Sequence, residues 1–359
     1  MYFSDTYFHN FRNLRQGRVS WSSGFNLISG PNGAGKTNFI EGLNLISGWG
    51  PIESATKISS VPAWGKGSEP KASLWARVQG EESMDLFASI SVKCSLKCGE
   101  KAIGASAMRA KIPVLTFLSD GMSLIRGSAS ARRALLDRIG AIISPSYAMR
   151  LHDYRKALRQ KTVLLRRGRE TMAADRVLVQ LGSWLWAARE EILKLLSSAL
   201  ESYAELTPCP MELLFTRGGG GTAEGPSEDF KGSLAVKKNR ERDLRTPLVG
   251  PQRDDVRILC GGINAVLFLS RGQSRRAASA LILAASAVVE RRIGRKPILI
   301  FDELTSELDE EGRNSLVEAL LKTDCQVFGA SADSLDYKGV SVHRLKDGMF
   351  LEQPPVNMY

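Results

Sequence analysis

The stretch Gly30-Pro31-Asn32-Gly33-Ala34-Gly35-Lys36-Thr37 lies between an apolar run at 25–29 and a run with helical spacing at 38–46. The first run is typical of a buried strand, and the second places its apolar residues on one helix face. Glycines let consecutive backbone N–H groups curve around an anion, and the following helix N-terminus adds its positive end. The stretch therefore predicts a phosphate-binding loop that holds a nucleoside triphosphate.

Two side chains of this loop have defined roles in the pattern. Lys36 supplies a point charge for the β- and γ-phosphates, and the Thr37 hydroxyl is a ligand for Mg²⁺. The complete pattern between a strand and a helix favours this interpretation over an ordinary glycine-rich turn. We expect the nucleotide-binding residues to be Gly30, Pro31, Asn32, Gly33, Ala34, Gly35, Lys36, Thr37 and Asn38.

A second element is the apolar run 297–301, which ends in the carboxylates of Asp302 and Glu303. Asp302 is expected to hold Mg²⁺ through its water shell, and Glu303 to polarise the attacking water. The alternative interpretation is that Asp302 and Glu303 are two solvated acids at the edge of a strand, without a catalytic role. Together with Lys36 these acids form the predicted catalytic set. Ser306 and Asp309 follow directly, as in a D-loop, and a helix is expected from about Glu310.

A third element is the turn that leads into a long apolar helix at 277–289. Its residues Ser270, Gly272 and Gln273, with Arg271 between them, suit a second phosphate-binding surface at a helix N-terminus. The economical arrangement is a head-to-tail dimer, in which this signature turn of one copy caps the γ-phosphate held by the other. The order of the three elements is that of an ABC-type ATPase, which implies ATP and Mg²⁺ as cofactors.

Composition narrows the class further. The chain has 359 residues and 43% hydrophobic content, which suits a two-lobed body. The longest apolar segment is too short to span a bilayer, and no signal peptide is apparent, so we expect a cytoplasmic protein. The five cysteines are scattered and the three histidines form no cluster. We therefore expect free thiols and no metal apart from the Mg²⁺ of the nucleotide.

The net charge of +11 is unevenly distributed along the chain. One basic run occupies 150–169 and a second occupies 231–245. Such runs are usually solvated helix faces, but two of them in a basic chain favour binding to a polyanion. Phosphate contacts add salt-dependent affinity without base recognition. We therefore predict contact with the DNA backbone.

The expected fold class is α/β: an ABC-type ATPase head with an inserted, mainly helical second lobe and no long coiled coil. The expected domains are 1–117 and 292–359 for the nucleotide lobe and 118–291 for the inserted lobe. A flexible break is expected at 218–226, followed by a hairpin of two strands at 256–259 and 265–268. Other strands are expected at 3–11, 25–29, 72–78, 86–92, 326–330 and 340–345.

Several segments resemble the RecF family, bacterial recombination-mediator ATPases related to SMC heads. The start and the phosphate loop match, but three middle segments are more specific, because SMC heads and transporter ATPases lack them. The matching segments are 8–13, 30–38 with Glu41, 127–137, 147–161 and 250–255.

The resemblance has departures. Glu303 stands where the family more often has a second aspartate, and Ser274 where it often has a glutamine. Asp120 lies in a segment that replaces a usual Pro-Glu-Asp, so its role is open. No Q-loop glutamine is placed, and Ser331 stands near the position of a transporter's switch histidine. These departures predict slow hydrolysis.

The resemblance implies action at single-strand gaps or stalled forks, within DNA repair, replication and the SOS response. It implies RecR and RecO as partners in loading RecA. Arg12 is expected either to reach toward the nucleotide phosphates or to form a structural salt bridge. DNA contact, with lobe packing as the alternative, is expected for Arg132, Arg133, Arg155, Arg159, Lys161 and Arg253.

The preferred interpretation is an ATPase that dimerises on ATP, holds double-stranded or gapped DNA while closed, and releases it on hydrolysis. A second interpretation is the nucleotide-binding subunit of an ABC transporter. That class predicts a Q-loop, a switch histidine and no basic inserted lobe, and none of these is clearly present. A third is an ATP-gated interaction protein whose hydrolysis is nearly idle.

Overall fold

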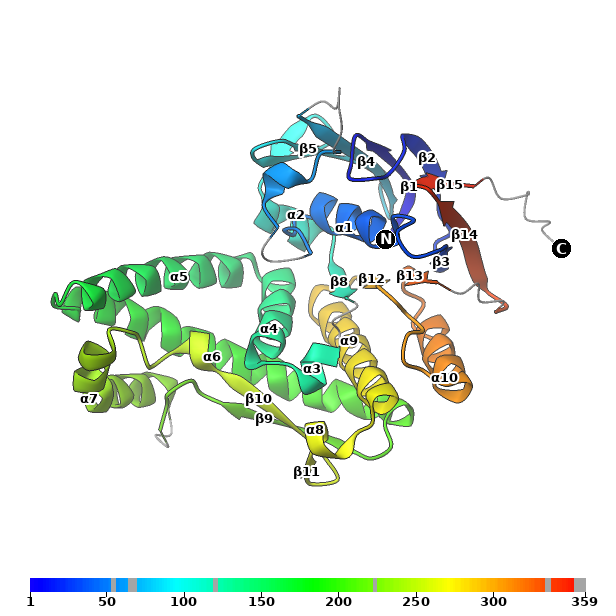
Figure 1. Cartoon of the computed structure of the whole chain (residues 1–359). Coiled ribbons are helices and arrows are strands. Elements are labelled where there is room, and N and C mark those ends of the chain that lie inside the picture. The colour runs from blue at the N-terminus through cyan, green and yellow to red at the C-terminus, as the bar shows by residue number, and fades with distance from the viewer. Residues whose placement is uncertain (53–55, 64–69, 119–121, 222–224, 333–336, 352–359) are drawn as a thin grey trace. The chain divides into compact units, whose positions relative to one another are not determined.

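The computed structural model describes residues 1–52, 56–63, 70–118, 122–221, 225–332 and 337–351. Asp120 lies outside these ranges. The chain forms two compact units, coloured along the chain in Figure 1. Unit 1 contains Met1–Gly121 and Ala285–Tyr359, and unit 2 contains Met122–Ala284. Each unit has a core of its own, so the two are described separately.

A six-stranded, largely parallel sheet forms the centre of unit 1. Its order is β15-β14-β3-β13-β12-β8, and only the pairing of β15 with β14 is antiparallel. Every residue of β3, β12 and β13 is buried, as expected for parallel strands covered on both faces. The strands are β3 (Phe25–Ser29), β8 (Val114–Phe117), β12 (Ile298–Phe301), β13 (Val327–Ser331), β14 (Val340–Lys346) and β15 (Met349–Phe350).

The second sheet of unit 1 is antiparallel, with the order β2-β1-β4-β5-β6-β7. Strand β4 alternates buried and half-buried residues, as a strand with one face on the core does. Helix α1 (Lys36–Ile46) contacts both sheets and adds Phe39 to an aromatic core. The strands are β1 (Tyr2–His9), β2 (Gly17–Ser20), β4 (Ala72–Gln79), β5 (Met84–Ile90), β6 (Cys94–Cys98) and β7 (Lys101–Ile103).

Gln326, directly before β13, joins the two sheets of unit 1. Its amide oxygen accepts from the Phe3 N–H at 2.7 Å, and its amide nitrogen donates to the Phe3 carbonyl at 2.8 Å. The short elements of this unit lie around the sheets. They are the 3₁₀ turn η1 (Ile58–Ser60) and the helices α2 (Ala105–Lys111) and α10 (Glu310–Leu321).

Unit 2 is mainly helical, with a three-stranded sheet of order β11-β10-β9. Helix α9 (Arg271–Ile293) begins in unit 2 and ends in unit 1. None of the described helices has the length and apolarity needed to cross a membrane. The other elements are α3 (Ser123–Arg126), α4 (Ala129–Ile143), α5 (Pro145–Arg166), α6 (Met172–Leu200), η3 (Glu201–Leu206), β9 (Met211–Thr216), α7 (Pro226–Leu244), η4 (Pro251–Arg253), β10 (Asp255–Cys260), β11 (Ile263–Asn264) and α8 (Ala265–Phe268).

A buried ionic network holds the helices of unit 2 to the turn at 250–255. The Arg189 guanidinium contacts Asp254 at 2.6 Å and Asp137 at 2.8 Å, and its side chain is 3% exposed. The Trp186 indole N–H donates to Asp254, and the Tyr147 hydroxyl donates to Asp137, both at 2.7 Å. Each buried charge therefore has several partners, as burial requires.

One expectation for unit 2 is wrong: residues 265–268 form helix α8 and not a strand, because the Asn264 side chain caps the helix by accepting from the Val266 N–H. The long partner of β10 is β9, a strand that was not expected. The described part of the expected flexible break is a hydrogen-bonded turn, in which Gly218 N–H donates to Asp254 at 2.7 Å and Gly221 N–H to Asp229 at 2.6 Å.

The expectation of free thiols is wrong for one pair. Cys209 and Cys260 form a disulfide, with Cα atoms 5.7 Å apart. Cys260 pairs with Met211 across β9 and β10, so the antiparallel register brings Cys209 beside it. Cys94, Cys98 and Cys325 are free.

The Arg189 network generates a prediction for stability. Arg189→Ala should lower the free energy of unfolding by about 3–5 kcal/mol, because it leaves the buried Asp254 carboxylate without its cation and removes the buried one of the two cations that contact Asp137. Arg155→Ala is the matched control, since Arg155 pairs with the same Asp137 but is 58% exposed. The control should cost less than about 1 kcal/mol. Urea unfolding followed by circular dichroism measures both, and equal losses would contradict the account.

Candidate functional site

The loop at 30–35 has a backbone that glycine alone accommodates easily. Gly33 and Gly35 have φ of +81° and +112°. A Cβ on Gly30 would lie 2.0 Å from the Leu345 carbonyl oxygen, and one on Gly35 would lie 2.8 Å from the Asn13 side-chain oxygen. Non-glycine residues rarely adopt positive φ, so the glycines fix the loop in this shape. The loop then enters α1, whose first residue is Lys36.

Lys36 lies folded against its own loop. Its Nζ donates to the Gly30 carbonyl at 2.6 Å and to the Pro31 carbonyl at 3.0 Å. Burial lowers the pKa of Lys36, and the nearby charges of Asp302 and Glu303 partly oppose this effect. A cation in such surroundings is stabilised by an additional anion, and phosphate oxygens would supply one.

Thr37 and Asp302 are in direct contact although 265 residues separate them. The Thr37 hydroxyl donates to Asp302 Oδ2 at 3.0 Å, and the Glu303 backbone N–H donates to Asp302 Oδ1 at 3.1 Å. Burial raises the pKa of Asp302, and the hydrogen bond from Thr37 counteracts this rise. A hydroxyl and a carboxylate are the hard oxygen donors that Mg²⁺ prefers, so this pair fits the ion that accompanies a nucleotide.

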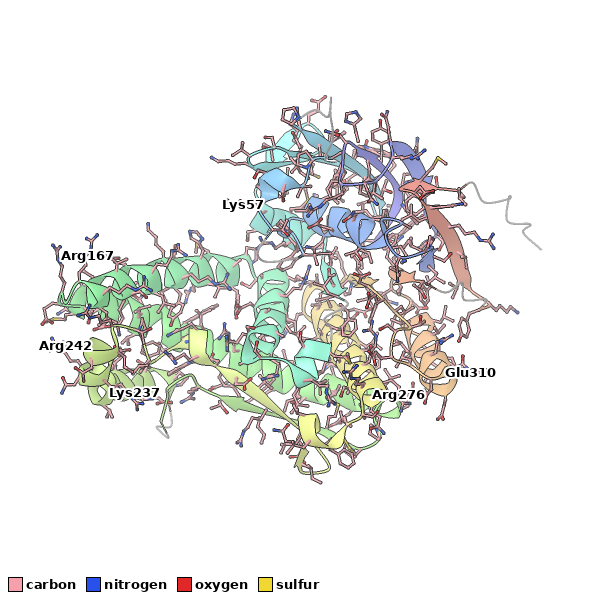
Figure 2. The ribbon with its side chains drawn as sticks, viewed as in Figure 1. Lys57, Arg167, Lys237, Arg242, Arg276 and Glu310 are labelled. Atoms are coloured by element: carbon pink, nitrogen blue, oxygen red, sulfur yellow. A yellow bond between two sulfur atoms is a disulfide. The ribbon has the colours of Figure 1, made fainter. Side chains whose placement is uncertain are left out.

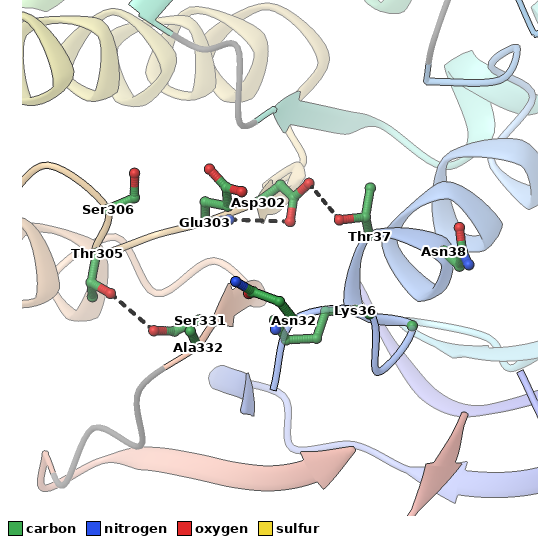
Figure 3. Close-up of a pocket in the computed structure, with 12 residues that line it drawn as sticks. Asn32, Lys36, Thr37, Asn38, Asp302, Glu303, Thr305, Ser306, Ser331 and Ala332 are labelled. Atoms are coloured by element: carbon green, nitrogen blue, oxygen red, sulfur yellow. Dashed lines mark hydrogen bonds between the residues drawn. The ribbon is translucent and has the colours of Figure 1, made fainter. Parts of the chain in front are cut away.

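These residues line a pocket of about 560 Å³, shown in Figure 3. Glu303 lies at its edge and has φ of +49°, an uncommon value for a non-glycine residue. The Ser331 hydroxyl, at the end of β13, is 2.9 Å from the Thr305 hydroxyl. The lining consists of Asn32, Gly33, Gly35, Lys36, Thr37, Asn38, Asp302, Glu303, Thr305, Ser306, Ser331 and Ala332.

Two supports of the loop were missed by the sequence reasoning. Asn13 donates to the Gly33 carbonyl at 3.0 Å and accepts from the Asn38 side chain at 2.7 Å. Gly348 donates its N–H to the Ala34 carbonyl at 3.0 Å. Asn13 belongs to the family-like start of the chain, which was the available signal. Gly348 lies far away in sequence, and its role follows only from the pairing of β14 with β3.

Arg12 forms a structural salt bridge. Its guanidinium contacts both carboxylate oxygens of Glu41, at 2.8 and 3.0 Å, and donates to the Ser60 carbonyl at 3.3 Å. Of the two expectations for Arg12, this is the one that the structure displays. A bidentate pair with a buried carboxylate orients the guanidinium toward α1.

The signature turn begins α9 with reciprocal hydrogen bonds. The Gln273 backbone N–H donates to the Ser270 hydroxyl at 3.2 Å, and the Ser270 N–H donates to the Gln273 side-chain oxygen at 2.9 Å. This arrangement is a capping box, which satisfies two backbone donors of the helix N-terminus. Ser270 and Arg271 are exposed. Gly272 and Gln273, which follow them, are half-buried.

The two expected D-loop residues lie just before the start of α10. Ser306 lines the pocket. Asp309 is the N-cap of α10, because its carboxylate accepts from the Gly312 N–H at 2.9 Å. Capping therefore accounts for an aspartate at this position without reference to a nucleotide.

The DNA candidates fall into different environments. Lys161 must be withdrawn, because its side chain is 1% exposed and pairs with Glu241 at 2.5 Å and Asp175 at 2.8 Å. Arg132 contacts both oxygens of Asp255 at 2.8 and 3.2 Å. Arg133 and Arg253 each donate to a backbone carbonyl, of Asp254 and Pro247 respectively. Arg155 and Arg159 are exposed on α5.

The loop geometry generates a prediction. Gly35→Ala should lower the free energy of unfolding by about 1–3 kcal/mol, because alanine is strained at this φ and its Cβ meets Asn13. Gly24→Ala is the control, since a Cβ there meets open space, and it should change stability by less than about 0.5 kcal/mol. Thermal unfolding of the two variants measures the difference, and equal melting temperatures would contradict the argument.

Comparison with known proteins adds independent information. The family model of the AAA domain matches residues 7–72. The curated DNA replication and repair protein RecF of Thermoanaerobacter sp. (strain X514) is 25% identical over 365 residues, covering 98% of this chain and 100% of that protein. RecF of Symbiobacterium thermophilum is 29% identical over 333 residues, covering 89% of this chain and 88% of that protein.

Solved structures show the same likeness in three dimensions. The recombination mediator protein RecF with ATP has a TM-score of 0.86 and 23% identity, and the match covers 98% of each chain. An Smc head bound to the C-terminal winged-helix domain of ScpA has a TM-score of 0.59 and 14% identity, covering 98% of this chain and 97% of that one. The fold is therefore that of an ABC-type ATPase head with an inserted helical lobe, and along nearly its whole length this chain is similar to the RecF proteins.

Proposed function

We propose that this chain is an ATP-dependent DNA-binding protein that dimerises on ATP and acts in recombinational DNA repair and replication restart, helping to load recombinase at gaps. The observation that carries the ATPase part is the contact of the Thr37 hydroxyl with Asp302 Oδ2 at 3.0 Å, beside the Lys36 ammonium. This pair is the expected holder of a nucleotide's Mg²⁺. The similarity to RecF proteins over nearly the whole chain supports the pathway.

The pocket residues divide the work of hydrolysis. Lys36 exchanges the Gly30 and Pro31 carbonyls for phosphate oxygens, and the loop N–H groups hold the remaining negative charge. Thr37 and Asp302 would hold Mg²⁺, which would supply positive charge against the phosphates of the nucleotide. Glu303 accepts a hydrogen bond from the attacking water and orients it in line with the γ-phosphate.

The signature turn completes the site from a second copy. Ser270 is exposed, and the exposed N-terminus of α9 adds its positive end at the same place. The Ser270 oxygen accepts the capping N–H from Gln273, which leaves its hydroxyl proton available to a phosphate oxygen. In a head-to-tail dimer, Ser270 in unit 2 of one copy and Lys36 in unit 1 of the other would contact the same nucleotide.

Binding to double-stranded or gapped DNA is proposed to occur in the ATP-bound dimer and to end on hydrolysis. The net charge of +11 and the exposed arginines of unit 2 support a sequence-independent interaction with phosphates. RecR and RecO as partners, and a cytoplasmic location, rest on the similarity to RecF proteins alone.

Slow turnover has a specific structural argument. Ser331 is the nearest counterpart of a transporter's switch histidine, and its hydroxyl is engaged with that of Thr305. A neutral hydroxyl cannot contribute the charge that a histidine can. This feature favours slow hydrolysis, which would set the time at which DNA is released, over fast hydrolysis that powers continuous work. It also disfavours the interpretation of the chain as a transporter subunit.

The shared site can be tested by mixing two inactive variants. Lys36→Met should prevent phosphate binding, and Ser270→Arg should block the contact of the signature turn with the γ-phosphate. Neither variant should therefore form dimers with ATP when it is the only protein present. Mixed in equal amounts, they should form dimers with one intact site, composed of Lys36 of one copy and Ser270 of the other. Sedimentation mass and phosphate release with ATP and Mg²⁺ measure the recovery.

The mixture separates two arrangements. If both surfaces served the same nucleotide within one chain, no intact site could form and mixing would recover nothing. A double variant carrying both substitutions in one chain is the control, because it offers no intact pair to any partner. Recovery with wild type but never between the two single variants would contradict the head-to-tail dimer.

The role of Glu303 gives a second prediction. Glu303→Gln should lower the turnover of ATP by about 100-fold or more, because the amide cannot act as a base for water. The ATP-dependent dimer should persist and dissociate more slowly than that of wild type. Glu310→Gln, in the exposed first turn of α10, is the control and should leave turnover unchanged. Unchanged turnover in Glu303→Gln would remove Glu303 from the mechanism.

A further inference from the structure

The two basic runs of the sequence differ in where their exposed cations lie. On α7, Lys231 pairs with Glu228 at 2.9 Å and Arg242 pairs with Glu170 at 2.6 Å. Lys237 donates to the Gly219 carbonyl at 2.5 Å. Three cations of this run are therefore engaged within the protein. The exposed Lys238 and Arg240 lie about 200° apart around the helix, at about 100° per residue, so they do not share a face. Figure 2 labels Lys237 and Arg242 on this helix.

The exposed cations of the run on α5 are arranged differently. Lys156, Arg159 and Arg166 are exposed, as is Arg167 directly after the helix, labelled in Figure 2. Among the residues that the structure describes, no carboxylate forms an ion pair with any of these four. Only Arg155 on this face has one, with Asp137 at 3.1 Å.

The helical spacing places these cations on a single face. Arg155 and Lys156 lie three to four residues before Arg159, and Arg166 lies two turns after it. Like charges at such spacing destabilise a helix, so folding alone does not account for this face. Arg150 does not belong to it, because its guanidinium stacks on the Trp184 ring at 4.4 Å.

The opposite face of α5 is fixed to the rest of unit 2. Tyr147 donates to Asp137, Tyr154 donates to Gln252, and buried Lys161 pairs with Asp175 on α6 and Glu241 on α7. The basic face is therefore presented on a rigid element. Between Arg155 and Arg166 it is roughly 17 Å long at about 1.5 Å per residue, or about half of the roughly 34 Å turn of B-DNA.

We propose that the backbone of duplex DNA binds along the exposed face of α5, through Lys156, Arg159, Arg166 and Arg167. This inference rests on the proposed DNA-binding function and assigns that function to one of the two basic runs. The cations act as phosphate contacts, so affinity is strongly salt-dependent and independent of base sequence. The α7 run makes no comparable contribution.

The test compares two triple variants with wild type. In the first, Arg159→Gln, Arg166→Gln and Arg167→Gln remove three charges from the α5 face. In the matched control, Lys238→Gln, Arg240→Gln and Arg245→Gln remove three exposed charges of the second run. Binding of a mixed-sequence duplex is measured by fluorescence anisotropy with ATP and Mg²⁺ at several salt concentrations.

The α5 variant should bind at least about tenfold more weakly near 0.1 M salt, and the slope of log affinity against log salt should fall by roughly 2 to 3, about 0.9 for each lost contact. The control should keep the slope of wild type. Circular dichroism and ATP binding should be unchanged in both variants, which separates a lost contact from a lost fold.

Several results would overturn the inference. If wild type binds DNA and the α5 variant keeps the same affinity and slope, the surface is wrong while the proposed function stands. Equal losses of DNA affinity in both variants would show that the net positive charge of the chain, and not the exposed face of α5, determines binding. If wild type fails to bind DNA at low salt in every nucleotide state, the proposed function itself fails. Loss of binding to phosphatidylglycerol vesicles or to duplex RNA, with DNA binding retained, would assign the face to another polyanion.

Discussion

The parallel pairing of β3, β13 and β12 is the constraint on which the nucleotide site depends. Because the three strands run in the same direction, their carboxyl ends meet at one edge of the sheet. Lys36 and Asp302 follow the ends of β3 and β12, and Ser331 is the last residue of β13. The Thr37–Asp302 contact is a direct result of this register. A slip of β12 against β13 by one residue would turn Asp302 to the opposite face and separate it from Thr37. The chemistry proposed for this chain therefore depends first on sheet register, and only then on the identity of the catalytic side chains.

Local signals were sufficient for the parts of the fold that depend on local chemistry. The glycines of the phosphate loop, the apolar run of β12 and the helix that starts at Glu310 could be predicted, because each has its own turn, period or cap. Contacts between distant segments could not be predicted in this way. The apolar run at 265–268 was predicted as a strand of a hairpin, but the Asn264 cap makes it a helix. The Cys209–Cys260 pair and the burial of Lys161 depend on which residues lie opposite them, and that information is absent from a linear pattern.

Several polar groups that suggest function also have structural roles. Ser270 and Gln273 cap α9, Asp309 caps α10, and Arg12 neutralises buried Glu41. Such roles do not compete with nucleotide recognition, since a capped helix N-terminus presents its remaining N–H groups in a fixed direction. In unit 2 the Arg189 network provides a similar rigidity for α5 and the turn at 250–255. The chain thus uses its buried charges for rigidity and leaves its unpaired cations on the surface.

The central claim is that ATP brings Ser270 of one copy against the phosphate pocket of another. Crosslinking between two differently tagged copies tests it most directly, with Ser270→Cys in one copy and Ser306→Cys at the pocket of the other. The account predicts that a short bis-maleimide yields a product carrying both tags only when ATP and Mg²⁺ are present. Copies without the new cysteines report the background from Cys94 and Cys98. Failure to form the product that carries both tags with ATP and Mg²⁺, or its equal formation without nucleotide, would contradict the account.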